Sequence, residues 1–314
     1  MVICTVTLNA SVDKAYKIDG QVNPGCVMRV VKAENFAGGK GLNCARAIST
    51  CGKDVLATGF VGGHNGKLFL DLLDQDGVEH DFVNVGTETR CCINVIDSCG
   101  ASTEFLEPGA QVTDEELKMF QVKLDTLLDK ADLITFNGSL PAGLSSSAYA
   151  TLIKKVNDAG KLSILDTSGQ RLIEGIEALP TMIKPNIDEM QQILGRNISE
   201  DSLDEILAGA EDIYRRGIKY VVVSLGANGS VMVCDEGVFR GVINQPVKVI
   251  NTVGAGDTMV GAFAVGMVRK DRPADILKYA MSCATANCMS PETGHFNKQD
   301  ADLVYPTISI TKLK

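Results

Sequence analysis

The feature that most restricts the fold is a regular alternation of helix-like and strand-like stretches between residues 110 and 225. Thr113 precedes the first of these helices and Glu116 follows three residues later, which is the pattern of a capping box. Such alternation predicts a mostly parallel sheet with helices on both faces. The expected helices are 114–130, 145–159, 170–178, 187–194 and 202–216, and the expected strands are 133–137, 162–166, 182–184 and 220–225.

The remaining stretches extend the same α/β domain, and we expect one domain over residues 1–314. The apolar segment 1–8 predicts a first buried strand, and the run 258–266 predicts a buried helix. Pro273 suits the first turn of another helix. The other expected elements are strand 55–61, helices 41–51 and 67–75, and a hairpin formed by 230–234 and 238–243.

Two segments, at about 14–35 and 86–107, have the texture of strands without helices between them. Residues 27–33 alternate between apolar and polar side chains. Residues 91–97 and 102–106 flank a Ser-Cys-Gly-Ala stretch, which predicts a hairpin. We therefore expect a second, small sheet that stands off the main one.

Composition excludes several classes of protein. The net charge is −9 and the pI is about 5.0, which argues against a general binder of nucleic acid or anionic membranes. The sequence has no apolar run of about 18 residues and no basic leader, so we expect a cytoplasmic protein. Ten cysteines without a C-x-x-C pair, and three histidines far apart in the sequence, argue against a zinc site.

The stretch 251–257, Asn-Thr-Val-Gly-Ala-Gly-Asp, opens the expected helix at 258–266. Gly254, Ala255 and Gly256 let the backbone approach a ligand closely, and unpaired N–H groups at a helix start favour an anion. Asp257 either caps the helix or, beside a bound phosphate, accepts a proton from an attacking hydroxyl. The chain lacks the complete P-loop pattern, and Met259 stands where a dinucleotide fingerprint needs a third glycine.

A second glycine-rich stretch, Ala-Gly-Gly-Lys-Gly-Leu-Asn at 37–43, also opens a helix. In this order and at this distance, the two stretches resemble the ribokinase-like sugar kinases of phosphofructokinase B type. The resemblance implies a three-layer α/β/α fold, with ATP and Mg²⁺ as cofactors. It also implies that the small sheet is a lid over the sugar and, as a family habit, a dimer surface.

On the nucleotide side, the resemblance implies that Ser224, Gly226 and Gly229 line the ATP phosphates together with Thr252, Gly254 and Gly256. Asn186 and Glu189 match an Asn-x-x-Glu element that, by the same resemblance, organises magnesium through bound waters, since Mg²⁺ keeps several of them. Lys184 would offset phosphate charge, with Asp166 as its partner. The alternatives are a hairpin turn at 224–230, and a helix cap by Asn186 with Glu189 on the surface.

On the acceptor side, the resemblance implies that Asp13, Gly38, Gly39 and Asn43 bind sugar hydroxyls. Asp13 lies just past the expected first strand, where ligands of open α/β sheets gather; the alternative is a turn residue. A phosphate on the sugar would need cations and hydroxyls at its far end. The candidates are Lys40, Arg90, Arg29 and Ser139, against the alternative that the cations are solvated surface charges.

Residues 7–13 and 36–43 look most like the branch that phosphorylates fructose 1-phosphate and tagatose 6-phosphate, although Ala10 stands where that branch usually has proline. The predicted function is phosphotransfer from ATP to a primary hydroxyl of a ketohexose phosphate, with Asp257 as base. Fructose 1-phosphate is preferred and tagatose 6-phosphate is a close second. The alternatives are a free-sugar or nucleoside kinase, or a non-catalytic sugar-phosphate sensor.

Overall fold

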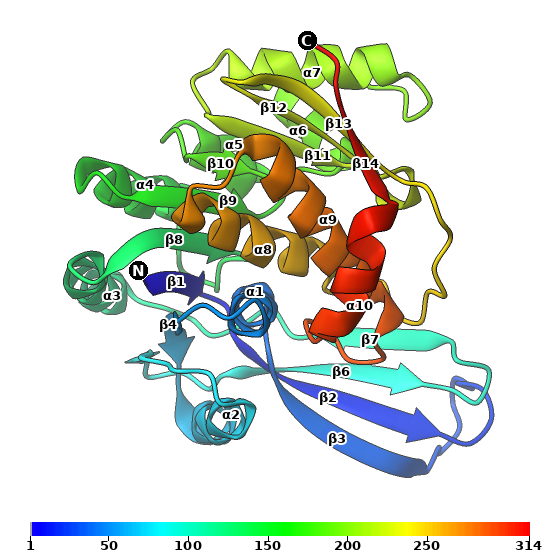
Figure 1. Ribbon diagram of the computed structural model, residues 1–314. Coiled ribbons are helices and arrows are strands. Elements are labelled where there is room, and N and C mark those ends of the chain that lie inside the picture. Colours follow the sequence, from blue (N-terminus) through cyan, green and yellow to red (C-terminus); the bar gives the residue numbers. More distant parts are fainter. Residues whose placement is uncertain (1) are drawn as a thin grey trace.

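A ten-stranded sheet forms the centre of the computed structural model, which describes residues 2–314 (Figure 1). Seven neighbouring strands, from β11 to β5, pair in parallel, and the other three join antiparallel at the β11 edge. The spatial order is β14 (Ile308–Lys312), β13 (Gly237–Ile243), β12 (Ser230–Cys234), β11 (Tyr220–Ser224), β10 (Met182–Ile183), β9 (Leu162–Asp166), β8 (Ala131–Asn137), β1 (Val2–Thr7), β4 (Val55–Val61) and β5 (Val83–Asn84).

Ten α-helices among the described residues cover both faces of this sheet, and each face has its own apolar core. One core packs α1 (Lys40–Thr50), α2 (Gly63–Asp76), α8 (Ala255–Arg269), α9 (Pro273–Met289) and α10 (Lys298–Val304). The other packs α3 (Asp114–Leu128), α4 (Ala148–Asp158), α5 (Gln170–Ile176), α6 (Ile187–Leu194) and α7 (Leu203–Tyr214). The expected alternation and mostly parallel sheet are confirmed.

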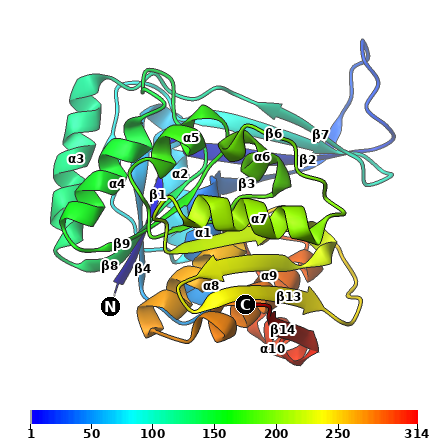
Figure 2. The same cartoon turned by 90° about the horizontal axis from the view of Figure 1, so that it is seen from above.

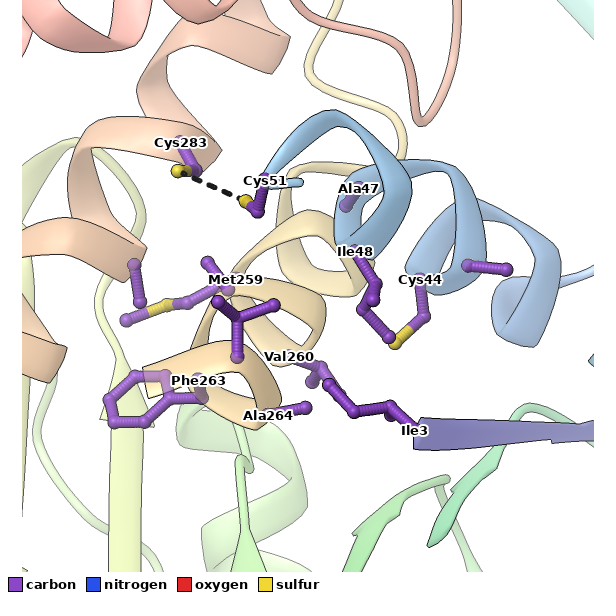
Figure 3. Packing of buried hydrophobic residues seen from close by; sticks show 14 of the residues in the cluster. Ile3, Cys44, Ala47, Ile48, Cys51, Met259, Val260, Phe263, Ala264 and Cys283 are labelled. Atoms are coloured by element: carbon purple, nitrogen blue, oxygen red, sulfur yellow. Dashed lines mark hydrogen bonds between the residues drawn. The ribbon is translucent and has the colours of Figure 1, made fainter. Parts of the chain in front are cut away.

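Strand alternation explains how one sheet supports two cores. In β11, Val222 points into one core while Val221 and Val223 point into the other. In the first core, α8 lies against α1 and α9, so the apolar run that the sequence places after residue 257 is buried all round (Figure 3). The thiols of Cys51 and Cys283 lie 4.0 Å apart where α1 meets α9.

The second sheet has four strands and projects from one side of the molecule (Figures 1 and 2). We call it the lid sheet. In spatial order it contains β3 (Val30–Gly38), β2 (Ser11–Ile18), β6 (Arg90–Ile96) and β7 (Ser102–Leu106). The pair β2–β3 is antiparallel, β2–β6 is parallel, and β6–β7 is the expected hairpin.

Two predictions for the lid sheet differ from the structure. The strand expected at 27–33 begins at Val30 and continues to Gly38, because its pairing with β2 extends that far and Val27 is fully in solvent. Asp13 lies within β2 and not in a loop after β1, because the chain turns at once and joins the lid sheet. The first strand was expected from Met1, which lies outside the described residues; β1 begins at Val2.

Across residues 2–314, no helix is both long and apolar enough to cross a membrane.

Candidate active site

The two glycine-rich helix starts meet at the carboxyl end of the sheet. Asn43, in the first turn of α1, donates from Nδ2 to Oδ2 of Asp257, in the first turn of α8, at 2.8 Å. The helices approach closely because Gly261 stands at their crossing. A Cβ there would lie 2.8 Å from the Cys44 carbonyl oxygen and 3.0 Å from the Ala47 Cβ. Two stretches more than 200 residues apart in the chain therefore build one site.

The start of α8 is shaped to receive an anion. Gly254 takes the N-cap position at φ 81°, a left-handed conformation that glycine tolerates, and none of the described side chains caps the helix. The Ala255 N–H makes a long bond of 3.4 Å to the Thr252 carbonyl, whereas the N–H groups of Gly256 and Asp257 have no backbone acceptor among residues 2–314 and are left for a ligand. Asp257 does not cap its own helix, because its carboxylate is turned towards Asn43.

Asp257 is buried, with 6% of its surface exposed. Burial raises its pKa to about 6, against the opposing influence of Lys40, Asn43 and Lys184. Asp166 adds to the rise through charge repulsion. The carboxylate is thus ionised at neutral pH yet basic enough to take a proton, which suits a general base.

Two lysines flank Asp257 and share one buried partner. The Lys184 Nζ lies 3.4 Å from Oδ1 of Asp166, as the sequence predicts, and the Lys40 Nζ lies 3.7 Å from Oδ2. Although burial opposes it, Lys184 and Lys40 hold the pKa of Asp166 below its usual value. A Cβ on Gly256 would lie 3.2 Å from the Lys184 Nζ, so this ammonium stands beside the start of α8. One ammonium group therefore lies directly beside the anion site.

Asp13 and Gly38, predicted to bind the acceptor, lie together where β2 begins and β3 ends beside α1. A Cβ on Gly38 would lie 2.1 Å from the Asp13 Cγ, so only glycine fits against this carboxylate. Ser11 donates to Oδ1 of Asp13 at 2.6 Å. Gly39, at φ 132°, then turns the chain from β3 directly into α1. The carboxylate is held through Oδ1, and Oδ2 can still accept a hydrogen bond from a hydroxyl.

Arg90 and Ser139 are brought together through Asn9. The Asn9 amide donates to the Ser139 Oγ at 2.9 Å, and Arg90 Nη2 donates to the Asn9 carbonyl at 3.0 Å. Arg90 Nη1 donates to the Glu107 carbonyl, while its buried Nε finds no hydrogen-bond partner among residues 2–314. Arg29 does not join this group, because it precedes β3 at the opposite end of the lid sheet from Gly38.

Lys40 also differs in place from the other expected phosphate ligands. Its side chain passes Gly138, next to Ser139, but its ammonium reaches Asp166. It therefore stands at the Asp257 end of the site.

On the nucleotide side, Ser224 ends β11, and Gly226 opens the short 3₁₀ turn Gly226–Asn228. Gly229 has φ 84°, and a Cβ there would lie 2.2 Å from the Gly241 carbonyl oxygen. The backbone N–H of Ser224 donates to the Pro185 carbonyl at 3.0 Å, which ties this turn to the segment that carries Lys184 and Asn186. The turn thus connects the two strands of a hairpin and also lies next to other residues that are predicted to bind the nucleotide.

Asn186 and Glu189 cap α6 reciprocally. Asn186 Oδ1 accepts from the Glu189 N–H at 2.8 Å, and Glu189 Oε2 accepts from the Asn186 N–H at 3.0 Å. Burial, and to a lesser extent Asp166, raise the pKa of Glu189, so its carboxylate lies within the field of the lysine-paired aspartate. Within the described part of the chain, no three His, Cys, Asp or Glu side chains form a ready-made metal cluster.

Two positions that sequence reasoning missed support this site. Asn287, on α9, donates to the Val253 carbonyl at 2.9 Å and accepts from the Thr258 hydroxyl at 3.2 Å, which fastens the 251–254 loop, including exposed Thr252, to α8. Arg46, on α1, donates to Oδ1 of Asn43 at 3.2 Å. Both are polar residues inside otherwise apolar helices, and that is the signal by which they could have been found.

The sequence profile described as pfkB family carbohydrate kinase matches residues 6–300. The chain belongs to the pfkB family. A pfkB chain of this kind is an ATP-dependent sugar kinase, and the fold just described is the ribokinase-like fold.

Relatives of this pfkB chain match it over nearly its whole length. A curated tagatose-6-phosphate kinase of Staphylococcus epidermidis is 35% identical over 314 residues, which cover 99% of this chain and 100% of the relative. Phosphofructokinase-2 of Escherichia coli, solved with potassium, has a TM-score of 0.91 at 28% identity over 97% of this chain and 98% of its own. A possible 1-phosphofructokinase of Thermotoga maritima, at 24% identity and full coverage of both chains, shares the fold with a TM-score of 0.89.

Proposed function

We propose that this kinase transfers the γ-phosphoryl group of ATP to the primary hydroxyl of a ketohexose phosphate, with Asp257 as the general base. The observation that carries the proposal is the hydrogen bond from Asn43 to Asp257. It joins the acceptor side, which Gly38, Gly39 and Asn43 form, to the anion site at the start of α8. A carboxylate between these two sites is where a proton would have to be accepted.

Three groups of residues take part in the reaction: the Asp257 carboxylate, the backbone amides at 254–256, and two lysines. The sugar oxygen attacks the γ-phosphorus, its proton passes to the Asp257 carboxylate, and the bond from phosphorus to the departing ADP oxygen breaks. The amides of Gly254, Ala255 and Gly256 face the charge on the transferring group. The ammonium groups of Lys40 and Lys184 lie beside it. Positioning and electrostatics therefore supply most of the catalysis.

Asn186 and Glu189 suit magnesium held through water. Their mutual cap uses Glu189 Oε2, so Oε1 remains to accept from a metal-bound water. This donor set fits Mg²⁺, which retains several waters and needs few protein oxygens. When bound with ATP, Mg²⁺ would neutralise charge on the phosphates.

The acceptor phosphate is assigned to Arg90 and Ser139. Their link through Asn9 and the unused Arg90 Nε support an anion at this point. We assign Lys40 to the transferring phosphoryl group instead, because its ammonium lies near Asp166 and Asp257. The 35% identical relative supports tagatose 6-phosphate, which the sequence alone ranks just behind fructose 1-phosphate.

A panel of acceptors tests the substrate class. ADP formation would be followed with tagatose 6-phosphate, fructose 1-phosphate, fructose 6-phosphate and unphosphorylated fructose. We expect at least one of the phosphorylated sugars to exceed fructose by about 100-fold in kcat/KM, which is what two charge-assisted hydrogen bonds supply. A preference for the free sugar would contradict the assignment of Arg90 and Ser139, and no ADP with any sugar would favour a sensor.

Asp257→Asn tests the base. The amide keeps the size of the side chain but cannot accept the proton, so turnover should fall by at least about 100-fold while nucleotide binding stays within about threefold. Single-turnover ADP formation and calorimetric titration with a non-hydrolysable ATP analogue measure the two quantities. Near-normal turnover would remove Asp257 as the base.

We also propose that the lid sheet forms a homodimer. The register places Phe36 and Leu106 on the same face as Asp13, and 43% and 64% of their surfaces are exposed. Exposed apolar side chains on one face of a sheet indicate an interaction surface. One solved structure of E. coli phosphofructokinase-2, which is 28% identical to this chain, is described as a tetrameric inhibited form, and this supports self-association.

A further inference from the structure

Arg46 is a buried cation that none of the steps above employs. It lies on α1 among apolar neighbours, with 6% of its surface exposed. Its Nε and Nη2 donate to Oδ2 of Asp76, at 2.9 and 2.5 Å, where α2 ends. Its other bonds run towards the active site: Nη2 donates to the Ala37 carbonyl at 2.6 Å, and Nη1 donates to Oδ1 of Asn43 at 3.2 Å.

These bonds determine which end of the Asn43 amide faces Asp257. A guanidinium has only donors, so the atom of Asn43 that meets Arg46 must be the oxygen. The NH₂ end of the same amide then points to the Asp257 carboxylate, which accepts at 2.8 Å. Without Arg46, the Asn43 oxygen would lose this donor, and the bond to Asp257 alone would hold the amide in its present orientation.

The same guanidinium also holds the acceptor side. Ala37 is the residue before Gly38 and Gly39 and pairs with Val12, next to Asp13. By binding the Ala37 carbonyl and the Asn43 side chain at once, Arg46 fixes the end of β3 against the first turns of α1.

We infer that Arg46, anchored by Asp76, is a positioning residue that holds the Asn43 amide in the orientation that donates to Asp257. The inference rests on the proposed role of Asp257 as the base.

Loss of Arg46 should therefore change the acidity of Asp257. A hydrogen bond to the ionised form lowers a carboxyl pKa, so losing it raises the pKa. The other charged groups near Arg46, Asn43 and Asp257 belong to several elements, and replacing Arg46 leaves these groups unchanged. Lys40, Asp166 and Lys184 surround Asp257, while Asp13, Asp76 and His295 lie around Arg46, and Glu292 lies near His295.

A titration of Asp257 itself provides the direct test. The carboxyl band is followed by infrared difference spectroscopy between each protein and the same protein carrying Asp257→Asn, so no sugar is needed. We expect an apparent pKa of about 6 in the natural protein. In Arg46→Lys, whose single ammonium cannot span three acceptors, we expect a rise of about one unit, as in Asn43→Ala. The double variant Arg46→Lys/Asn43→Ala should match Asn43→Ala alone.

Arg269→Lys is the matched control, because Arg269 also binds α1 but at its far end, through the Cys51 carbonyl at 3.0 Å. It should leave the titration of Asp257 in place. If sugar phosphates are substrates, Arg46→Lys should also lower kcat by about tenfold, move the acid limb of the kcat profile upwards and leave the KM for ATP within about twofold.

Two results would overturn the inference: an unchanged Asp257 titration in Arg46→Lys despite reduced kcat, or shifts that simply add in the double variant. If Arg46→Lys does not fold by circular dichroism, Asp76→Asn takes its place, since Asp76 is partly exposed. It should move the pKa in the same direction by a smaller amount, and no movement would refute the role of the Asp76–Arg46 pair. A failure of all sugars in the acceptor panel would refute the proposed function and leave this titration interpretable.

Discussion

At the scale of single residues, the site depends on how one carboxylate is surrounded. Asp257 is buried enough for its pKa to rise, yet Asn43 and two lysines keep it ionised near neutral pH. Asp166, equally buried, has its pKa lowered because Lys184 and Lys40 overcome its burial. The pKa values of two aspartates within one site are thus shifted in opposite directions. Asp257 is suited to accept a proton, and Asp166 remains a fixed negative charge.

The pH dependence of turnover follows from the raised pKa of Asp257. The base must be ionised, so kcat should fall as the pH drops through about 6 and should be about tenfold below its plateau at pH 5. A raised carboxyl pKa stabilises the folded chain at low pH and loses that contribution as the pH rises through 6, so unfolding by this group does not cause the acid loss. Rates at saturating substrate, measured at each pH, test this prediction. As a control for unfolding, activity is measured again after the protein is returned to pH 7.5. A kcat profile that stays flat down to pH 4.5 would contradict the prediction.

Arg90 gives a second prediction at this scale. Arg90→Ala should raise the KM for the sugar phosphate by at least about tenfold and change the KM for ATP by less than about twofold, because only the acceptor loses a charge-assisted bond. Arg29→Ala is the control and should change neither, since Arg29 lies at the far end of the lid sheet. Equal increases in both constants would make Arg90 a structural residue that only holds the carbonyls of Asn9 and Glu107.

At the scale of elements, local sequence predicts most of the helices and strands of the main sheet. The capping boxes at Thr113 and Asn186 are determined by residues three apart, so they can be read directly. The extent of β2 and β3 could not be predicted from the sequence, because it depends on pairing between segments that carry weak local signals.

The candidate site divides in the same way. The glycine-rich turns are visible in the sequence because a ligand-binding backbone needs small residues. The partners of Arg46 and Asn287 are not contained in a local pattern, because Arg46 binds Asp76 at the end of α2 and Asn287 binds the Val253 carbonyl and Thr258 from another helix. Lys40 precedes the expected helix 41–51 but is the first residue of α1, and the direction of its long side chain is decided by Asp166 in another element.

The contact between α1 and α8 predicts the effect of a larger residue at Gly261. Gly261→Leu should destabilise the fold by about 1–3 kcal/mol, because the new side chain must displace the Cys44 carbonyl and Ala47. It should also separate Asn43 from Asp257 and lower kcat. Chemical denaturation measures the first effect. Gly86→Leu is the control, since Gly86 is exposed with 3.7 Å of space, and a similar loss there would remove the argument from packing.

At the scale of the whole molecule, the lid sheet projects from the main domain (Figure 2). Apolar side chains on it, such as Phe36 and Leu106, are exposed to water. If this face pairs with a second copy, Leu106→Asp should convert a dimer to a monomer, because a buried unpaired carboxylate costs several kcal/mol. Light scattering after size-exclusion chromatography measures the mass. Leu303→Asp, at a site on α10 that is 70% exposed, should leave the mass unchanged. A monomeric natural protein at micromolar concentration would refute the dimer.

The direct connection from β3 through Gly39 into α1 has a consequence for the hydrolysis of ATP in the absence of a sugar. Only one residue separates the strand of the lid sheet from the helix that carries Asn43, so a displacement of the strand is transmitted to the helix without slack. A sugar that spans Asp13 and Gly38 can pull on this junction, whereas a lone water molecule cannot. We therefore expect wasteful cleavage of the nucleotide to stay slow until an acceptor arrives, which ADP release measured without any sugar would reveal.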